Sequence, residues 1–159
     1  MAQTISRYPV ATALFALPFA LPAVWWLDHN QIEDDDVRFR LATLVVERLT
    51  AAAISAASVV LVFLALGRIA SPGVAIGVAL TYAFGSSIWS IGSQALWQHE
   101  LAALSLAGLS LALIAPDTRR NAVLAGLGAA LAAGARPTMA IFSLLALIFV
   151  WRRGALDWK

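Results

Sequence analysis

His99 and Glu100 stand side by side in the stretch SQALWQHELAAL, residues 93–104, between two long apolar stretches. An ionisable side chain in or beside a membrane core costs roughly 2.5 to 3.5 kcal/mol on insertion scales, so such residues are retained where capping or chemistry needs them. A neutral imidazole beside a carboxylate can accept a proton, position an acceptor hydroxyl or help to bind a metal. The pair can also cap the first turn of a helix. The sequence leaves catalysis and capping open.

A second group of candidates is the acidic run EDDD, which contains Asp34, Asp35 and Asp36. Closely spaced carboxylates can supply oxygen ligands to a divalent cation or act as a base. The run lacks the spacing of a calcium-binding loop, which favours a solvated loop leading into a helix. In that helix Asp36 and Arg40 have the spacing of an i to i+4 ion pair. No other cofactor is indicated.

Arg136 follows a glycine-rich segment and precedes Pro137. Its planar guanidinium suits a phosphate or pyrophosphate, such as the head of a lipid carrier. The alternative is an arginine that extends toward lipid headgroups. Glu47 and Arg48 also lie in an apolar segment, and we expect them to interact with their neighbours and not to react.

The composition decides the setting in which these groups work. Hydrophobic residues make up 61% of the 159 residues and charged residues 13%, whereas soluble domains are nearer half apolar and a quarter charged. An integral membrane protein is therefore expected, in contact with membrane lipid. The 11 Lys and Arg residues are scattered and form no basic face, so no nucleic-acid partner is indicated. The absence of cysteine excludes disulfides and thiolate chemistry.

Charges and Gly/Pro positions divide the chain into six apolar segments, over residues 9–27, 41–66, 74–91, 101–115, 122–135 and 138–151. A spanning helix needs about 20 residues, so the second and third are long enough and the last three need flanking residues. Pro18 and Pro22 interrupt the first, which spans or lies along the outer interface. The fifth and sixth are expected to form a hairpin turning at residues 135–138. The expected fold is all-α, a polytopic transmembrane bundle of five or six helices in a single domain, 1–159.

The positive charges predict an orientation for this bundle. If the segments alternate across the membrane, one side carries Arg68, Arg119, Arg120, Arg152, Arg153 and Lys159. The other side carries the acidic loop of residues 28–36, His99, Glu100 and Arg136. Because positive charge in short loops accumulates on the cytoplasmic side, the first side and the C-terminus are expected to be cytoplasmic and the second external.

Small residues favour close packing between some of these helices. Gly126, Ala130 and Gly134 recur every fourth residue in the fifth segment. A second small-residue face, in the second segment, consists of Ala51, Ser55 and Ser58 with Ala52 and Ala56. In lipid such faces let backbones approach and associate, within the chain or with a partner protein, although simple alanine richness would look the same.

Three stretches in order resemble a known family: SRYPVATALFALP (6–18), ALTYAFGSSIWSIGSQALWQHE (79–100) and LAGLGAALAAGARPTMAIF (124–142). They resemble bacterial polytopic glycosyltransferases that use dolichyl- or polyprenyl-phosphate sugars, which include the protein mannosyltransferase, aminoarabinose transferase and RgtA/B/C/D-like groups. The resemblance covers most of the chain, and its motifs are short and apolar.

The resemblance implies a bacterial inner-membrane enzyme that moves a sugar from a lipid phosphate to an acceptor on the external face. By resemblance, His99 and Glu100 match a second external loop and Arg136 a basic residue near the carrier phosphate. Relatives have more helices and a catalytic aspartate in the first external loop, which would lie before Met1. We therefore expect a piece of a larger domain: a gene fragment, a wrongly chosen start or a degenerate relative. The alternative is a small non-catalytic membrane protein that packs against a partner protein.

Overall fold

The computed structural model describes residues 10–116 and 118–152, which are helical throughout apart from short connections. The helices are α1 Val10–His29, α2 Val37–Leu66, α3 Pro72–Gly85, α4 Gln98–Ile114, α5 Arg119–Ala135 and α6 Ala140–Arg152. A π-helical turn, η1 Ile88–Gly92, precedes α4, and a 3₁₀ turn, η2 Pro137–Met139, precedes α6. No strand occurs in these residues, so the all-α prediction is confirmed.

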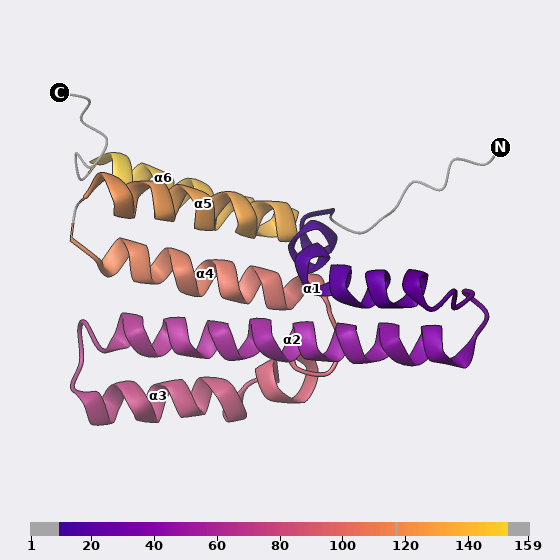
Figure 1. Cartoon of the computed structure of the whole chain (residues 1–159). Helices are drawn as coiled ribbons and strands as arrows, with labels where there is room; N and C mark the ends of the chain where they lie inside the picture. Colours follow the sequence, from indigo (N-terminus) through magenta and orange to yellow (C-terminus); the bar gives the residue numbers. More distant parts are fainter. Residues whose placement is uncertain (1–9, 117, 153–159) are drawn as a thin grey trace.

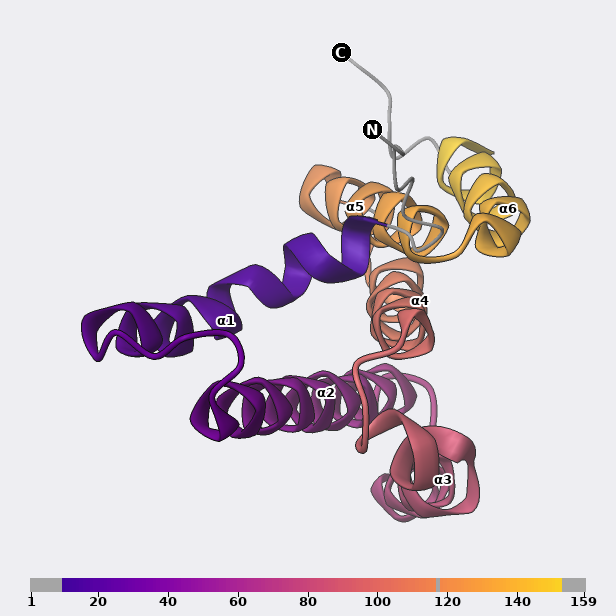
Figure 2. The same ribbon diagram turned by 90° about the vertical axis from the view of Figure 1, so that its right-hand side faces the viewer.

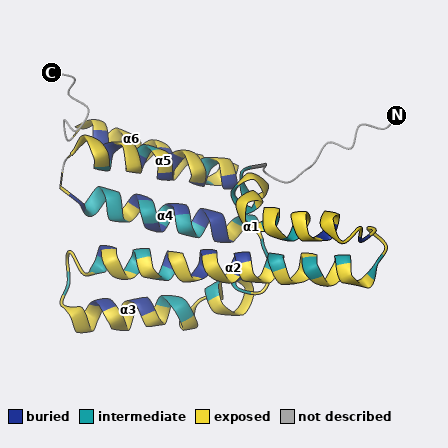
Figure 3. Ribbon diagram, in the orientation of Figure 1, coloured by how far each residue is buried: buried dark blue, intermediate teal, exposed yellow. Residues whose placement is uncertain are grey.

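The long helix α2 is the axis around which the others are arranged. Its 30 residues correspond to roughly 45 Å. In Figure 1, α3 and α4 lie alongside the C-terminal part of α2, and α5 and α6 lie beyond α4. The buried residues of α2 accordingly begin at Thr50 and end at Ala65. Figure 3 shows burial concentrated where α2, α4 and α5 face one another, while the outer faces are exposed. These exposed faces are largely apolar.

Two helices are long and apolar enough to cross a membrane, α1 over Ala11–His29 and α2 over Val37–Leu66. The other four have 13 to 17 residues and are too short for this criterion. The prediction of one long helix over residues 74–91 is wrong, because α3 ends at Gly85. Ser86 turns the chain there: it is extended, and its hydroxyl donates to the Tyr82 carbonyl and accepts from the Ile88 N–H at 3.3 Å.

The first helix is bent and barely packed. Pro18 and Pro22 lie inside it, and each removes a backbone donor and displaces the preceding turn. Figures 1 and 2 show its first part lying across the end of the bundle and its second part antiparallel to the start of α2. Only 6% of its most apolar 18-residue window is buried. Helix α1 therefore contributes little to the core.

The hairpin between the fifth and sixth apolar segments is confirmed, with α5 ending at Ala135 and α6 beginning at Ala140. Arg136 is extended, with φ −143° and ψ 118°, as the residue before a proline prefers to be. The Arg136 N–H still donates to the Ala132 carbonyl at 3.0 Å, which closes the last turn of α5.

The small-residue face predicted on α5 is wrong in its register. A Cβ added to Gly126 meets nothing within 4 Å, whereas one added to Gly128 meets Leu109 and the Ser105 carbonyl at 3.2 Å. The packed face of α5 consists of Ala122, Ala125, Gly128, Ala129, Ala132 and Ala135. On α2 the predicted face is correct only in part. Its buried members are Ala51, Ser55 and Ser58, while Ala52 and Ala56 are exposed.

Candidate functional site

The structure brings some of the predicted site residues to one end of the bundle. His99 and Glu100 lie in the first turn of α4, as expected, and Arg136 directly follows α5. Ala135 packs against Leu101 and Ala102 in one buried cluster, so the two helix ends are adjacent. The acidic loop is elsewhere, at the far tip of the hairpin formed by α1 and α2 (Figure 1). Asp34, Asp35 and Asp36 are thus not part of a site with His99.

Glu100 is buried, with 3% of its surface exposed. Its side chain faces Gly92 and Ser55: a Cβ added to Gly92 would lie 3.3 Å from Glu100 Oε1 and 3.2 Å from Ser55 Oγ. The backbone N–H groups of Trp97 and Glu100 lie near its carboxylate. Trp97 is the N-cap and Glu100 the third helical residue, which is the spacing of a capping box. Among the described residues, Glu100 Oε2 and Ser55 Oγ have no hydrogen-bond partner. Glu100 therefore has the geometry of a capping and packing group.

His99 points to a different environment from its neighbour, since it is exposed and lines a pocket of about 500 Å³. The pocket is lined by Thr12, Ala13, Glu47, Ala95, Leu96, Trp97, Gln98 and His99. A carboxylate, an imidazole, an amide, a hydroxyl and an indole thus surround one cavity. The Thr12 hydroxyl is buried and has no partner among the described residues. Such a set offers hydrogen bonds to a polar ligand with several hydroxyls.

Glu47, which was expected from the sequence to interact with its neighbours and not to react, lines the same pocket. It is half-buried on α2, and its Oε1 accepts a hydrogen bond from the Leu96 N–H at 3.3 Å. Sequence spacing gave no sign of this contact, because the two residues are 49 positions apart. The available signal was a single carboxylate in an apolar helix, where its cost calls for a reason. Glu47 and His99 are the two proton-accepting side chains that line this pocket.

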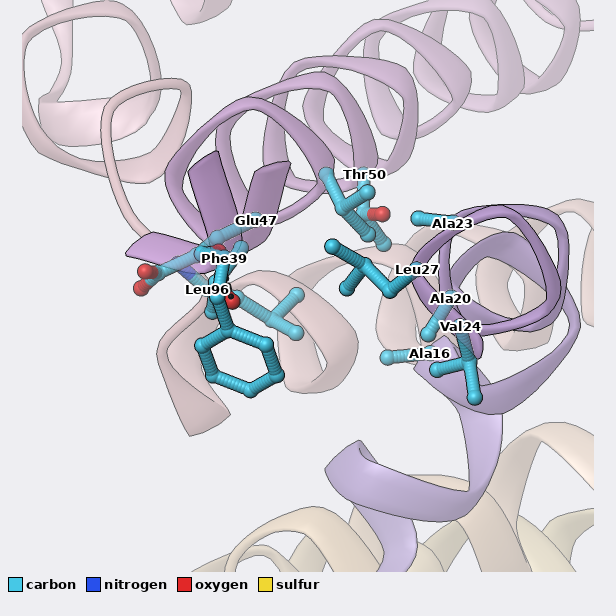
Figure 4. Close-up of a pocket in the computed structure, with 11 residues that line it drawn as sticks. Ala16, Ala20, Ala23, Val24, Leu27, Phe39, Glu47, Thr50 and Leu96 are labelled. Atoms are coloured by element: carbon cyan, nitrogen blue, oxygen red, sulfur yellow. Dashed lines mark hydrogen bonds between the residues drawn. The ribbon is translucent and has the colours of Figure 1, made fainter. Parts of the chain in front are cut away.

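An apolar groove of about 340 Å³ adjoins this pocket, and Glu47 and Leu96 line both. In Figure 4 the small side chains Ala16, Ala20 and Ala23 of α1 face Thr50 and the neighbouring residues of α2. The carboxylate of Glu47 lies at the edge of this group, beside Leu96 and away from Leu27. The two cavities together can hold a molecule with a hydrocarbon part and a polar head.

Asp36 is the N-cap of α2 and its carboxylate accepts the Arg38 N–H at 2.7 Å. The Arg38 guanidinium also pairs with it, with Nη2 2.7 Å from Oδ2. These side-chain and backbone hydrogen bonds lower the pKa of Asp36. The predicted Asp36–Arg40 pair is therefore wrong, because the N-cap is extended and directs its carboxylate at the residue two positions on.

The fold gives no support to the divalent cation that was considered for the acidic loop. No group of three or more His, Asp or Glu side chains that could hold a metal occurs within residues 10–116 and 118–152. Asp34 and Asp35 are exposed. The loop is a solvated connection leading into α2, as its spacing favoured.

Arg136 is half-buried and does not line the pocket that contains His99. Its assignment to a carrier phosphate stays a prediction. Comparisons with protein-family models, curated proteins and solved structures find no match for this chain.

Proposed function

We propose that the chain forms part of a membrane-embedded glycosyltransferase that takes a sugar from a polyprenyl-phosphate carrier on the external face of a bacterial inner membrane. One observation carries the proposal: an apolar groove leads into a pocket that presents Glu47 and His99. A lipid-linked sugar has the matching form, a long hydrocarbon chain attached to a hydroxyl-rich head. The three resembling stretches of sequence support the same class.

The placement in the membrane follows from charge. On α2, residues 49–66 carry no charged side chain, about 18 residues or roughly 27 Å, close to the ~30 Å of a hydrocarbon core. Glu47 and Arg48 mark the outer end of this stretch and Arg68 the inner end. Under this proposal α3–α6 cross alongside this part of α2, as short spans with locally thinned lipid. Arg119, Arg120 and the C-terminus are then cytoplasmic.

The proposed reaction is a displacement at the anomeric carbon of the donor sugar. The acceptor hydroxyl oxygen forms a bond to that carbon, and the carbon–oxygen bond to the carrier phosphate breaks, leaving its electron pair on the phosphate. Glu47 or His99 takes the acceptor's proton. The resemblance assigns the departing phosphate to Arg136, because a guanidinium matches phosphate oxygens. Arg136 does not line the pocket itself, but it follows Ala135, which packs on Leu101 and Ala102 of α4. Glu100, which is buried against Gly92 and Ser55, positions the first turn of α4.

A photoreactive polyprenyl phosphate tests the binding half of the proposal. With the purified chain in detergent, we expect the diazirine label in peptides of α1 and α2 that line the groove. Ala20→Trp fills the groove and should reduce labelling about tenfold, whereas Ala52→Trp, on an exposed face of α2, should not. Even labelling of all helices, or no effect of Ala20→Trp, would contradict the proposal. Sugar transfer from a polyprenyl-phosphate hexose tests the catalytic half.

A second function, a non-catalytic membrane protein that packs against a partner protein, is favoured by the exposure of α1. The two functions differ in a simple way. The enzyme binds polyprenyl phosphate in the groove and depends on Glu47 for transfer, while the non-catalytic protein does neither.

A further inference from the structure

The hairpin between α1 and α2 extends beyond the rest of the bundle. We define the outer hairpin as residues 20–48, that is, the second part of α1, the acidic loop and the start of α2. In Figures 1 and 2 only α1 lies beside this part of α2. Burial on α2 begins at Thr50, so residues 37–48 extend by roughly 18 Å past the packed region. Apart from α1, the described chain meets residues 37–48 at their inner end, where the Leu96 N–H donates to Glu47.

The outer hairpin exposes a stripe of large apolar side chains. On α2, Val37, Leu41 and Leu44 recur at i, i+4 and i+7, so they share one face of the helix. On α1, Leu21 and Val24 are also about half exposed. Isolated exposed apolar residues are ordinary, but a contiguous stripe at helical spacing is the form that packs against another helix.

Hydrocarbon lipid does not suit this surface. Residues 37–48 include Arg38, Arg40, Glu47 and Arg48, four charges in about three turns. Each costs several kcal/mol in a bilayer core. The uncharged stretch of α2 begins only at Leu49, so residues 37–48, the α2 part of the outer hairpin, belong outside the core in the membrane placement proposed above.

The tip of the outer hairpin is strongly acidic. Asp28, Glu33, Asp34 and Asp35 are exposed, and none of these four makes an ion pair within residues 10–116 and 118–152. A second copy of the chain packed side by side, in the same membrane orientation, would bring two such tips together. Like charges at an interface cost affinity, whereas a basic partner gains it.

We propose that the outer hairpin binds a helix of a partner protein, one that presents an apolar stripe to residues 37–45 and carries Lys or Arg beside the acidic tip. The apolar stripe supplies the buried area, and the four carboxylates select the partner and its direction. This inference does not depend on the proposed transferase function. The outer hairpin also lines part of the apolar groove, but the proposed surface is the stripe of Val37, Leu41 and Leu44, none of which lines that groove.

The test uses a single cysteine, since the chain has none of its own. Leu21→Cys labels the outer hairpin and Ile141→Cys labels an exposed apolar site on α6 as the control. The whole chain is reconstituted in phosphatidylcholine vesicles with the acidic tip outside. The probes are two synthetic amphipathic helices with the same apolar stripe, one ending in four lysines and one in four glutamates, each with a fluorescence acceptor.

Energy transfer from position 21 should show that the lysine-ended helix binds at least tenfold more tightly than the glutamate-ended helix. Energy transfer from position 141 should show no such preference. Asp34→Asn with Asp35→Asn should weaken the lysine-ended helix about threefold or more at low salt and leave the circular dichroism spectrum unchanged. Equal binding of both helices would overturn the proposal. So would energy transfer between two copies labelled at position 21, or quenching by brominated lipid as strong at 21 as at 141.

Discussion

The Leu96 N–H donates a hydrogen bond to Glu47 Oε1 at 3.3 Å, joining α2 to the segment that leads into α4. This contact fixes the turn that carries His99 against the side of the long helix. The same carboxylate also lines the pocket that contains His99. One carboxylate thus orders the pocket wall and supplies its charge.

Glu47→Gln separates these two roles. The amide oxygen can still accept from Leu96, so folding and thermal stability should change little. If Glu47 accepts the acceptor's proton, sugar transfer should fall by about 10² to 10⁴, the usual contribution of a general base. The measurement is transfer from polyprenyl-phosphate hexose, beside thermal unfolding. Arg48→Gln changes an exposed neighbour and is the control; it should keep both sugar transfer and thermal stability. Normal transfer by Glu47→Gln would remove Glu47 from the reaction and leave it a structural hydrogen-bond acceptor.

Glu100 is distinguished from Glu47 by its burial against Gly92 and Ser55. Glu100→Gln keeps the shape of the side chain, and its amide N–H can donate to an oxygen that now has no partner, such as Ser55 Oγ. The stability of the folded chain should therefore be equal or higher. Glu100→Ala should cost about 1–3 kcal/mol, because it leaves a cavity and uncapped backbone donors. Both are measured by thermal or denaturant unfolding in detergent. A large loss of transfer in Glu100→Gln, with unchanged stability and unchanged lipid binding, would instead restore the catalytic role predicted from the sequence.

Two glycines of α5 form a matched pair for testing how α4 and α5 pack. Gly128→Ala introduces a methyl group 3.2 Å from the Leu109 Cβ and backbone N and from the Ser105 carbonyl oxygen. These atoms belong to the backbone or are bonded directly to it, so they cannot move aside easily. We expect a loss of about 1–3 kcal/mol from overpacking. Gly126→Ala meets open space and should be neutral or stabilising by up to about 1 kcal/mol, because alanine favours helix. Unfolding experiments on the two variants decide between the registers. A larger loss at Gly126 would favour the face that the sequence predicted.

The sequence predicted helix boundaries well where prolines or charged residues separate the apolar segments. Pro137 after Arg136 placed the turn between α5 and α6, and the charges before Leu101 placed the start of α4. It failed where apolar residues hide a break: Gly85 and Ser86 interrupt the third segment, and nothing in hydropathy distinguishes them from a continuous helix. Side-chain roles were less predictable still. His99 and Glu100 are neighbours in sequence, yet successive residues of a helix point about 100° apart, so one faces the pocket and the other the interior.

The contact between Glu47 and Leu96 could not be predicted from the local sequence, for a different reason. Helical periodicity describes which residues share a face of one helix, and it contains no information on which loop will meet that face. The pocket is made from α1, α2 and residues 95–99, which lead into the first turn of α4, so only the packing of three distant parts of the chain reveals it.

The start of α2 gives a prediction about pH. Hydrogen bonds from the Arg38 side chain and backbone lower the pKa of Asp36 from its usual 3.8. Because the folded-state pKa is the lower one, the pair stabilises the helix start at pH values above 3.8, and this contribution is lost as the pH falls through the lowered pKa. In solution NMR of the chain in detergent micelles, the Asp36 carboxyl should therefore titrate below its usual value of 3.8. Arg38→Gln should raise the Asp36 pKa toward the ordinary value, while Arg40→Gln should not, since Arg40 makes no side-chain contact with Asp36 in the described structure. The reverse pattern, with Arg40 controlling the titration, would mean that the i to i+4 pair forms after all and that the N-cap geometry of Asp36 is not the dominant one.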